Sequence, residues 1–515
     1  MRKILNNKIS NVNQRKIGVL LQYAQMGLSI IIQLLYTPVM LRILGSTEYG
    51  IYNLAQSTIS YLSLLSLGFG ASYLRWYSLY KIDDDNEGIK RLNGLYLIVF
   101  LIVGFIALIA GLFLTVNVQW FYNETYSIRD VEIARTLMFF LTINLAISFP
   151  ASVFVSYITS QEHFVFQKIV NMGKTLLSPA VCIIVLYLGY GSIGMVVATT
   201  CISILIDIIN MYYCLKILHM GLIFRNPSWH LLKDIFAFSI FIAINQVIDQ
   251  INWQTDKIIL GKIVNGTAVA VYAVGSQINT YFTQFSTAVS STFAPKVNMI
   301  VSRNEDDMDD QLTLLFIKVG RIQWYILSLV LMGFIFFGRF FIFKWAGPEY
   351  SNSYYVAILL IAPALIPLIQ NIGIEIQRAK YKHKFRSIVY LFMAILNIGI
   401  SIWLASMWGE IGAAVGTTIS LLVANGLIIN IYYQNSLGIN IVRFWKNIGG
   451  TLPGFIIPII LGVCINRYYS FHSLIDFILI VLVYSFVYAF SLYFLSFNEE
   501  EKSMVNGIIH KVIKK

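Results

Sequence analysis

The residues best suited to chemistry form a polar stripe in an otherwise apolar stretch of the sequence, residues 234 to 256. Carboxamides and carboxylates recur there at the i, i+4, i+7 and i+11 spacing of one helix face, and a second row follows one position later. Inside a bilayer such groups are costly unless they face protein or a water-filled cavity, and carboxylates there often bind protons or sodium. The two rows consist of Asn245, Asp249, Asn252 and Asp256, followed by Gln246, Gln250, Trp253 and Lys257.

A second polar stripe lies in the first apolar stretch, residues 17 to 40, and has the same helical period. Because both stripes are long, we interpret them as lining one shared cavity. The alternative is that each stripe makes hydrogen-bonded contacts within its own half of the protein. The second stripe consists of Gln22, Gln25, Ser29, Gln33 and Thr37.

Two single charges are further candidates for the cavity. Arg42 follows Pro38 at one end of the first stretch and is out of phase with its stripe, so a role in a turn is equally consistent. Lys174 lies a turn or more inside the stretch 169 to 189. Its ammonium group would there either hold a lipid phosphate or pair with a carboxylate such as Asp207.

Residue patterns typical of enzymes and metal sites are weak. Gly173-Lys174-Thr175 resembles the end of a phosphate-binding loop, but that motif requires glycine where Lys168 stands. The run Asp83-Asp84-Asp85 has no folded partner and is better explained as a solvated charge run. Neither the six histidines nor the four cysteines have metal-ligand spacing. We therefore expect no catalytic residue, no metal and no cofactor.

The composition requires a bilayer as the solvent of this chain. Of 515 residues, 57% are hydrophobic and 12% are charged, and the mean hydropathy is +0.72, which leaves too little polar surface for a water-soluble globule. A transmembrane helix needs roughly 20 mostly apolar residues. The sequence therefore predicts an all-α polytopic membrane protein, with fourteen spans near residues 17 to 40, 49 to 74, 93 to 116, 132 to 157, 169 to 189, 191 to 215, 234 to 256, 266 to 290, 313 to 338, 353 to 376, 387 to 407, 410 to 433, 448 to 466 and 473 to 496.

Lys and Arg residues fall mainly in alternate connectors, and this bias predicts the orientation of the chain. The N-terminal segment, with Arg2, Lys3 and Lys8, lies on the same side as the basic connector 378 to 386, whereas the connector around Glu124 is acidic. Both termini are therefore predicted to be cytoplasmic. The same bias accounts for the net charge of +12. We expect no nucleic-acid partner, because no aromatic and basic nucleic-acid module accompanies this charge.

A repeat with an offset of 218 residues divides the sequence. Gly191-Ser192-Ile193-Gly194 recurs as Gly409-Glu410-Ile411-Gly412, and Leu41-Arg42-Ile43-Leu44-Gly45 recurs as Lys257-Ile258-Ile259-Leu260-Gly261 at a nearly equal offset. Because six predicted helices separate the copies, the copies are parallel, an architecture suited to alternating access. We predict two six-helix lobes and a terminal helix pair with a tail, over residues 1 to 225, 226 to 447 and 448 to 515.

The residues that follow the first stripe resemble a family signature. Thr37-Pro38-Val39-Met40-Leu41-Arg42-Ile43-Leu44-Gly45 and then Glu48-Tyr49-Gly50-Ile51-Tyr52 are similar to the first-helix signature of bacterial polysaccharide-biosynthesis membrane proteins. These are the Wzx-type O-antigen and capsule flippases of the multidrug/oligosaccharidyl-lipid/polysaccharide exporter superfamily. Asp256-Lys257-Ile258-Ile259-Leu260-Gly261 looks like the counterpart in the second lobe.

The resemblance implies a fourteen-helix, two-lobe flippase in the bacterial inner membrane. Such a protein carries an undecaprenyl-pyrophosphate-linked oligosaccharide to the outer leaflet for lipopolysaccharide O-antigen or capsule. The resemblance further implies membrane lipid, H+ or Na+ as a coupling ion, and a polysaccharide polymerase with a chain-length regulator as partners. In such proteins a cationic cavity between the lobes receives the sugar and the pyrophosphate. This sequence departs from a strongly cationic cavity, because Asp249 and Asp256 stand against Lys257.

Two other functions are compatible with parts of the sequence. An ion-coupled multidrug exporter of the same superfamily would share the lobes and differ in cargo. A membrane polysaccharide polymerase or ligase would be expected to present a large outer loop with catalytic residues, whereas the outer connectors here are short. We therefore predict transport and no enzymatic activity.

Overall fold

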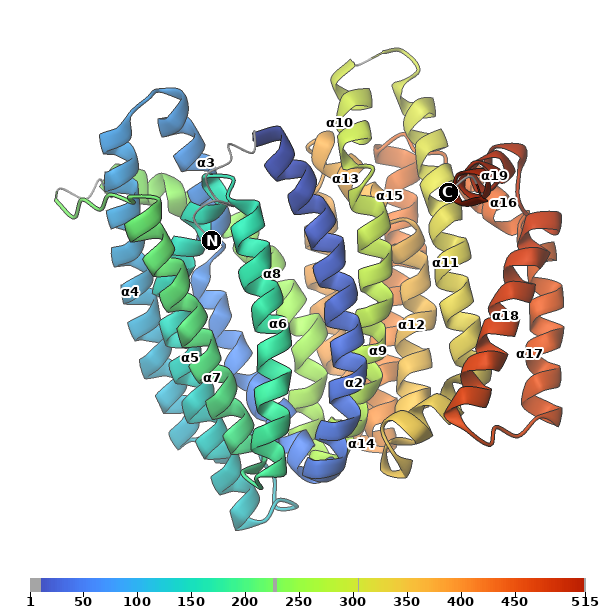
Figure 1. The fold of residues 1–515 in the computed structure, drawn as a ribbon, viewed down its shortest axis with the longest axis horizontal. Coiled ribbons are helices and arrows are strands. Elements are labelled where there is room, and N and C mark those ends of the chain that lie inside the picture. The colour runs from blue at the N-terminus through green and yellow to red at the C-terminus, as the bar shows by residue number, and fades with distance from the viewer. Residues whose placement is uncertain (1–10, 226–228, 304, 514–515) are drawn as a thin grey trace. The chain divides into compact units, whose positions relative to one another are not determined.

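The computed structural model describes residues 11–225, 229–303 and 305–513, and within these ranges the chain is almost entirely helical, with no strand (Figure 1). A segment in a bilayer must satisfy its own backbone N–H and C=O groups, which a helix does. The predicted all-α class is confirmed. Arg2, Lys3 and Lys8, on which the predicted orientation partly depends, lie outside the described residues.

The first of two compact units comprises Met1–Ala273 and Ile398–Ala413. Within it α4, α5 and α7 run side by side (Figure 1). The core is rich in aromatic rings, and Tyr73 and Tyr96 pack edge to face with ring centroids 5.0 Å apart. The elements up to residue 273 are α2 (Asn11–Ser60), η1 (Tyr61–Ser66), α3 (Phe69–Ile82), α4 (Asn86–Val116), η2 (Val118–Trp120), α5 (Ile128–Ser160), α6 (Phe164–Tyr187), α7 (Gly191–Tyr212), η3 (Tyr213–Ile217), α8 (Trp229–Ile263) and the start of α9 (Gly266–Ser291).

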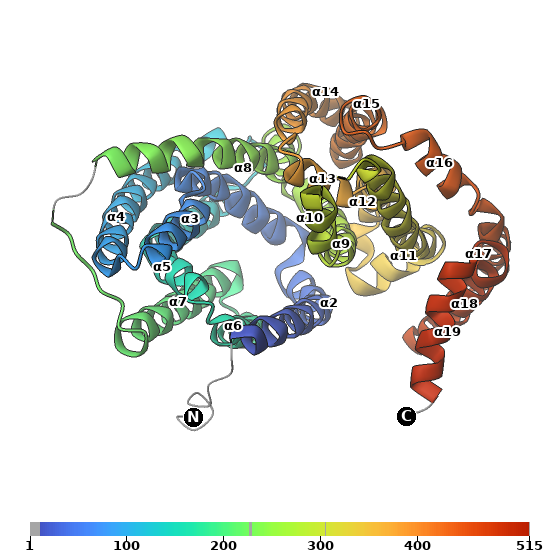
Figure 2. The same ribbon diagram turned by 90° about the horizontal axis from the view of Figure 1, so that it is seen from above.

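The second unit comprises Val274–Asn397 and Ala414–Lys515. Its core gathers aliphatic side chains around Phe316 and Phe444, whose rings meet edge to face at 4.9 Å. Figure 2 shows α17, α18 and α19 following one another at the C-terminal end of this unit. Its elements after α9 are α10 (Ala294–Arg303), α11 (Met308–Trp345), η4 (Pro348–Tyr350), α12 (Ser353–Ile369), α13 (Ile372–Ala379), α14 (Lys384–Leu421), η5 (Leu422–Ile428), α15 (Ile429–Ser436), α16 (Ile441–Gly449), η6 (Leu452–Phe455), α17 (Ile456–Tyr468), α18 (Leu474–Leu495) and α19 (Glu499–Ile513).

The two compact units are defined by contacts in space, whereas the predicted lobes were defined by the repeat in the sequence. The lobes at residues 1 to 225 and 226 to 447, with the terminal pair at 448 to 515, therefore stay a prediction.

By length and composition, nine helices of the described residues are able to cross a membrane, or up to eleven if each of two bent pairs counts as one span. Two of the nine are much longer than one crossing, because a bilayer core is about 30 Å thick and a helix rises about 1.5 Å per residue. Leu21–Ser66 has 46 residues and a kink at Gly45, and Lys384–Ser436 has 53 residues and a break at Gly409. Each has room for two of the predicted spans. The count of fourteen stays a prediction.

The first glycines of the two copies of the repeated motif have nearly equal φ angles. Gly191 and Gly409 have φ values of +58° and +57°, in the left-handed region that favours glycine. A Cβ at Gly194 or at Gly412 would lie 2.6 Å and 2.0 Å, respectively, from atoms of the helix that comes before it. In both copies, therefore, the first glycine makes the turn and the second lets the preceding helix approach closely.

Candidate functional site

The polar stripe of α8 lines a pocket against the 3-10 helix η1. The pocket has a volume of about 300 Å³ and lies within the first unit. α8 bends by 40° between His230–Ile240 and Ile242–Ile263, and the pocket lies along the second segment. The lining is polar on both sides and consists of Ser63 and Ser66 from η1 with Gln246, Asp249, Gln250, Trp253 and Gln254 from α8.

Hydrogen bonds fix one wall of this pocket to the other. The Gln250 Nε2 atom donates to the Ser60 carbonyl at 3.2 Å and to Ser63 Oγ at 3.0 Å. The Ser57 hydroxyl donates to Gln254 Oε1 at 2.9 Å. These two glutamines therefore hold α8 in register against the second part of α2 and against η1.

Gln246 differs from these two glutamines in its hydrogen bonding. Its Oε1 atom is buried, and no donor of the described residues reaches it. A buried acceptor without a donor is costly, and such atoms in native proteins usually meet water or a ligand. Gln246 and the exposed Asp249 are therefore the groups of this pocket best placed to receive a hydroxyl group or a cation.

The sequence predicted the polar stripe of α8, part of which lines this pocket, and did not point to the serine side. Ser57, Ser60, Ser63 and Ser66 recur every three residues. A 3-10 helix has three residues per turn and aligns positions i and i+3, and η1 covers Tyr61–Ser66. The three-residue spacing of the serines is the signal from which this wall could have been found.

The end of the α8 stripe is buried. Asp256 is only 1% exposed and accepts a hydrogen bond from the Tyr272 hydroxyl of α9. Lys257 lies close enough to Asp256 for their charges to interact. Asn252 is half-buried one turn before Asp256. The stripe is thus divided between a pocket-lining part, from Gln246 to Gln254, and a buried charged part.

The stripe of the first predicted span lies in the first part of α2. Gln22 is exposed and Gln25 is half-buried, while Gln33 donates through Nε2 to Ser29 Oγ at 3.0 Å, one turn earlier in the same helix. The α8 hydrogen bonds described above go to the second part of α2 and to η1. That both stripes line one cavity stays a prediction.

The two single charges lie on different elements. Arg42 is exposed and lies just before the kink at Gly45. Lys174 is half-buried in α6, and its charge interacts with that of Asp207 in α7. Among the described residues the two side chains do not come within ion-pair distance, so both roles considered for Lys174 stay predictions.

The signature residues around Glu48 have structural roles in the first unit. The Glu48 carboxylate accepts a hydrogen bond from the Ser192 N–H at 2.6 Å, which caps the N-terminus of α7 next to Gly191. A Cβ at Gly50 would lie 1.8 Å from the Gly266 carbonyl, so only glycine permits this approach of α2 to α9. Within the first unit, the signature therefore positions α2 against the start of α7 and the start of α9.

Comparisons with known proteins agree on a family and a fold. The family model described as polysaccharide biosynthesis protein matches residues 18–301, more than half of the chain. The probable low-salt glycan biosynthesis flippase Agl15 of Haloferax volcanii is 21% identical over 219 residues, which are 41% of this chain and 44% of that relative. The match thus spans less than half of the length of this curated relative.

Two solved structures have similar folds. The lipid II flippase MurJ superposes with a TM-score of 0.68 at 15% identity, over 92% of this chain and 97% of MurJ. A multidrug resistance MATE family transporter of the MOP superfamily superposes with a TM-score of 0.62 at 14% identity, over 82% of this chain and 96% of the transporter. These likenesses show that the chain has the fold that the two transporters share.

Proposed function

The chain belongs to the polysaccharide biosynthesis protein family, and we propose that it is a flippase for a lipid-linked oligosaccharide. The cargo is a repeat unit linked to undecaprenyl pyrophosphate, which moves from the cytoplasmic to the outer leaflet of a bacterial inner membrane by alternating access. The glycan then serves O-antigen or capsule assembly, with a polymerase and a chain-length regulator acting after the flippase. Both termini lie in the cytoplasm, and the chain itself carries out no covalent chemistry.

The observation that supports this function best is the polar pocket on α8, inside a segment long and apolar enough to span a membrane. Its lining combines hydroxyls, carboxamides and one carboxylate, groups that hydrogen-bond with the hydroxyls of a sugar. The Trp253 side chain adds a flat apolar surface beside them. A pocket for a purely apolar cargo would not need four amide and carboxylate side chains at this depth.

Asp249 is the residue we assign to the coupling ion. It is exposed in the pocket, whereas Asp256 is buried and hydrogen-bonded to Tyr272. A carboxylate in a water-filled pocket exchanges H+ or Na+ with solvent more readily than a buried one. Ion binding at Asp249 would then alternate with the cargo in the transport cycle.

A second candidate function is ion-coupled export of small amphiphilic compounds. The likeness to the MATE family transporter and the carboxylate in the α8 pocket favour it. Loss of the protein distinguishes the two functions: loss of a flippase leaves the lipid-linked repeat unit on the cytoplasmic side, whereas loss of an exporter leaves amphiphilic compounds in the cell.

Deletion of the gene tests the function directly. If the chain is the flippase, the lipid-linked repeat unit should still be synthesised but remain on the cytoplasmic side, and surface glycan should disappear. Wild-type protein should restore surface glycan, and the Asp249→Asn variant at equal abundance should restore much less. Unpolymerised repeat units on the outer leaflet would instead indicate a polymerase. Normal surface glycan with increased sensitivity to amphiphilic drugs would indicate the exporter.

A further inference from the structure

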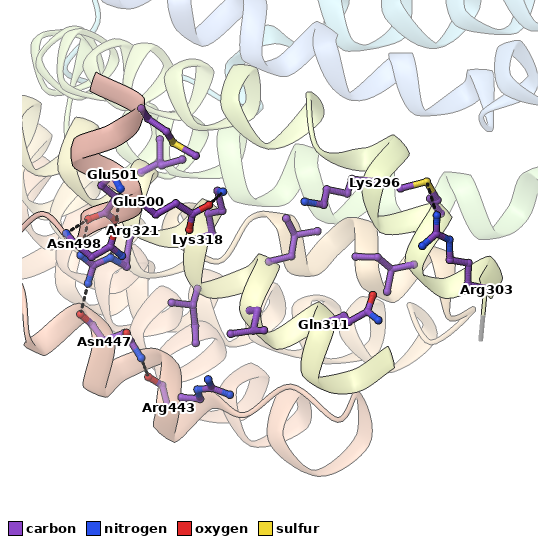
Figure 3. A pocket seen from close by; sticks show the side chains of 17 residues that line it. Lys296, Arg303, Gln311, Lys318, Arg321, Arg443, Asn447, Asn498, Glu500 and Glu501 are labelled. Atoms are coloured by element: carbon purple, nitrogen blue, oxygen red, sulfur yellow. Dashed lines mark hydrogen bonds and ion pairs between the residues drawn. The ribbon is translucent and has the colours of Figure 1, made fainter. Parts of the chain in front are cut away.

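A second pocket, of about 530 Å³, lies in the second unit at the ends of α10, α11 and α16, next to α19 (Figure 3). Five basic side chains line it against two acidic ones, so its net charge is positive. The basic residues are Lys296, Arg303, Lys318, Arg321 and Arg443, and the acidic residues are Glu500 and Glu501.

Three of these cations already have acidic partners. Arg321 pairs with Glu501 at 2.7 Å, Lys318 pairs with Glu500, and Arg443 pairs with Asp310 at 2.9 Å. The exposures of these pairs differ. The Arg321 side chain is 8% exposed, whereas that of Glu500 is 62% exposed and is held only at the pocket surface. The Lys318–Glu500 pair is therefore the weak one, because an exposed ion pair contributes little.

Lys296 and Arg303 differ from the other three cations. Both are exposed on α10, and within the described part of the chain no carboxylate lies at ion-pair distance from either. Figure 3 shows them across the pocket from Glu500 and Glu501, with Lys318 between the two groups. The pocket therefore offers two unneutralised charges and a third, Lys318, whose partner is easily displaced.

Apolar side chains lie directly beside these charges. Met299, Leu314 and Met504 line the same pocket and are 49%, 47% and 41% exposed. A soluble anion would gain nothing from this surface. A molecule with an anionic head and an apolar body would bury it while meeting the cations.

The depth of the pocket fits the headgroup region of a bilayer. α11 runs from Met308 to Trp345, and the rise from Lys318 to Trp345 is about 40 Å at 1.5 Å per residue. The hydrocarbon core with both headgroup regions is about 40 to 45 Å thick. Lys318 therefore lies at headgroup depth if Trp345 marks the opposite interface. With a cytoplasmic N-terminus, the connector after the eighth predicted span, which includes residues 305 to 307, is also expected on the cytoplasmic side, where anionic lipids are concentrated.

We propose that this pocket binds the phosphate headgroup of an anionic bilayer phospholipid. The phosphate oxygens accept hydrogen bonds from Lys296, Arg303 and Lys318, and the start of an acyl chain covers Met299 and Leu314. The phosphate displaces Glu500 from Lys318, while the buried Arg321–Glu501 pair keeps α19 attached. This lipid is a bound component of the protein rather than its cargo, so the inference does not depend on the transport function.

Native mass spectrometry of the purified full-length protein tests the site, with phosphatidylglycerol or phosphatidylcholine added in steps. The wild-type protein should retain phosphatidylglycerol in preference. The double variant Lys296→Gln, Arg303→Gln should lower phosphatidylglycerol affinity about tenfold or more, since each basic residue contributes about 1 kcal/mol to the binding of anionic lipid. Its phosphatidylcholine binding should be unchanged. The matched double variant Lys384→Gln, Lys446→Gln removes two exposed cations outside the pocket and should bind like wild type.

A change in the opposite direction separates binding from misfolding. Glu500→Gln removes the competitor of the phosphate and should raise phosphatidylglycerol affinity several-fold. Equal phosphatidylglycerol binding by the wild type and the Lys296→Gln, Arg303→Gln variant would overturn the proposal. Complete displacement of the lipid by millimolar inorganic phosphate would also overturn it, because the site would then recognise a free anion.

Discussion

The guanidinium of Arg321 and the carboxylate of Glu501 form a bidentate ion pair, with Nε–Oε1 and Nη2–Oε2 distances of 2.7 Å. Arg321 also donates to the Asn447 carbonyl at 3.1 Å and to the Ser496 carbonyl at 3.0 Å. One side chain of α11 thereby joins α16, the end of α18 and the start of α19. The planar guanidinium supplies donors for all of these acceptors at once, which a lysine could not do.

Removal of the Glu501 carboxylate should destabilise the protein strongly. The Glu501→Ala variant leaves a buried guanidinium without its counter-charge, a change that costs about 3 kcal/mol or more. Thermal unfolding of the purified protein in detergent measures the effect. Glu499→Ala is the matched control, because this residue lies two positions earlier, is 94% exposed and pairs with Lys502 at 3.4 Å. Equal unfolding temperatures of the two variants would contradict the assigned role of Arg321.

A side chain at Gly409, in the second copy of the repeated motif, should destabilise the protein modestly. Gly409→Ala places a Cβ at φ +57°, where nothing lies within 4 Å, so the cost is backbone strain of about 1 kcal/mol. Gly399→Ala in the same helix α14 also meets open space but has ordinary helical φ, so this control should be neutral or slightly stabilising. Unfolding measurements that rank the two variants in the reverse order would show that the turn is not set by Gly409.

The α8 pocket should matter for transport and not for folding. Asp249→Asn should leave membrane abundance unchanged and reduce translocation. Asn245→Leu and Gln25→Leu change the two polar stripes outside the pocket lining and should act in the same direction more weakly. Asp234→Asn is the control on the same helix, because Asp234 pairs with His230 outside the pocket. Surface glycan in a complemented deletion strain gives the readout. Full activity of Asp249→Asn and Asn245→Leu at normal abundance would contradict the cavity assignment and would indicate that both polar stripes only make packing contacts.

The sequence predicted the helices and the polar stripe of α8, because apolar length and 3.6-residue periodicity are local properties. Asp249, Gln246 and Gln250 were identified from that period alone. The serine wall was missed because η1 has three residues per turn and a shorter period than the one sought. Asp256 was grouped with the cavity residues, since its spacing matches theirs; only the tertiary contact with Tyr272 shows it to be buried.

The ionic cluster at Arg321 had no local signal. Arg321 and Glu501 are 180 residues apart, and a single arginine near a helix end is indistinguishable in sequence from one that extends to the headgroups. The repeat was detectable in the sequence because positions with positive φ favour glycine, as at Gly191 and Gly409. An ion pair between residues far apart in the sequence cannot be predicted from composition or from residue spacing.

The predicted orientation can be tested with two single cysteines in a cysteine-free background. Glu124 lies in the exposed connector before α5, and Lys382 lies in the exposed turn between α13 and α14. A membrane-impermeant thiol reagent added to intact cells should label Glu124→Cys and should reach Lys382→Cys only after the membrane is permeabilised. Labelling of both positions in intact cells would refute the cytoplasmic placement of the basic connector 378 to 386.

The most direct measurement of the proposed activity is translocation by the purified protein in liposomes. A lipid-linked oligosaccharide with a pyrophosphate linkage is incorporated with the protein, and a glycan-cleaving enzyme added outside reports the accessible fraction over time. Wild-type protein should make nearly all of the cargo accessible, whereas Asp249→Asn and protein-free liposomes should leave about half of it protected in the inner leaflet. If wild-type protein protected as much cargo as protein-free liposomes do, the chain would not be a flippase for this class of lipid.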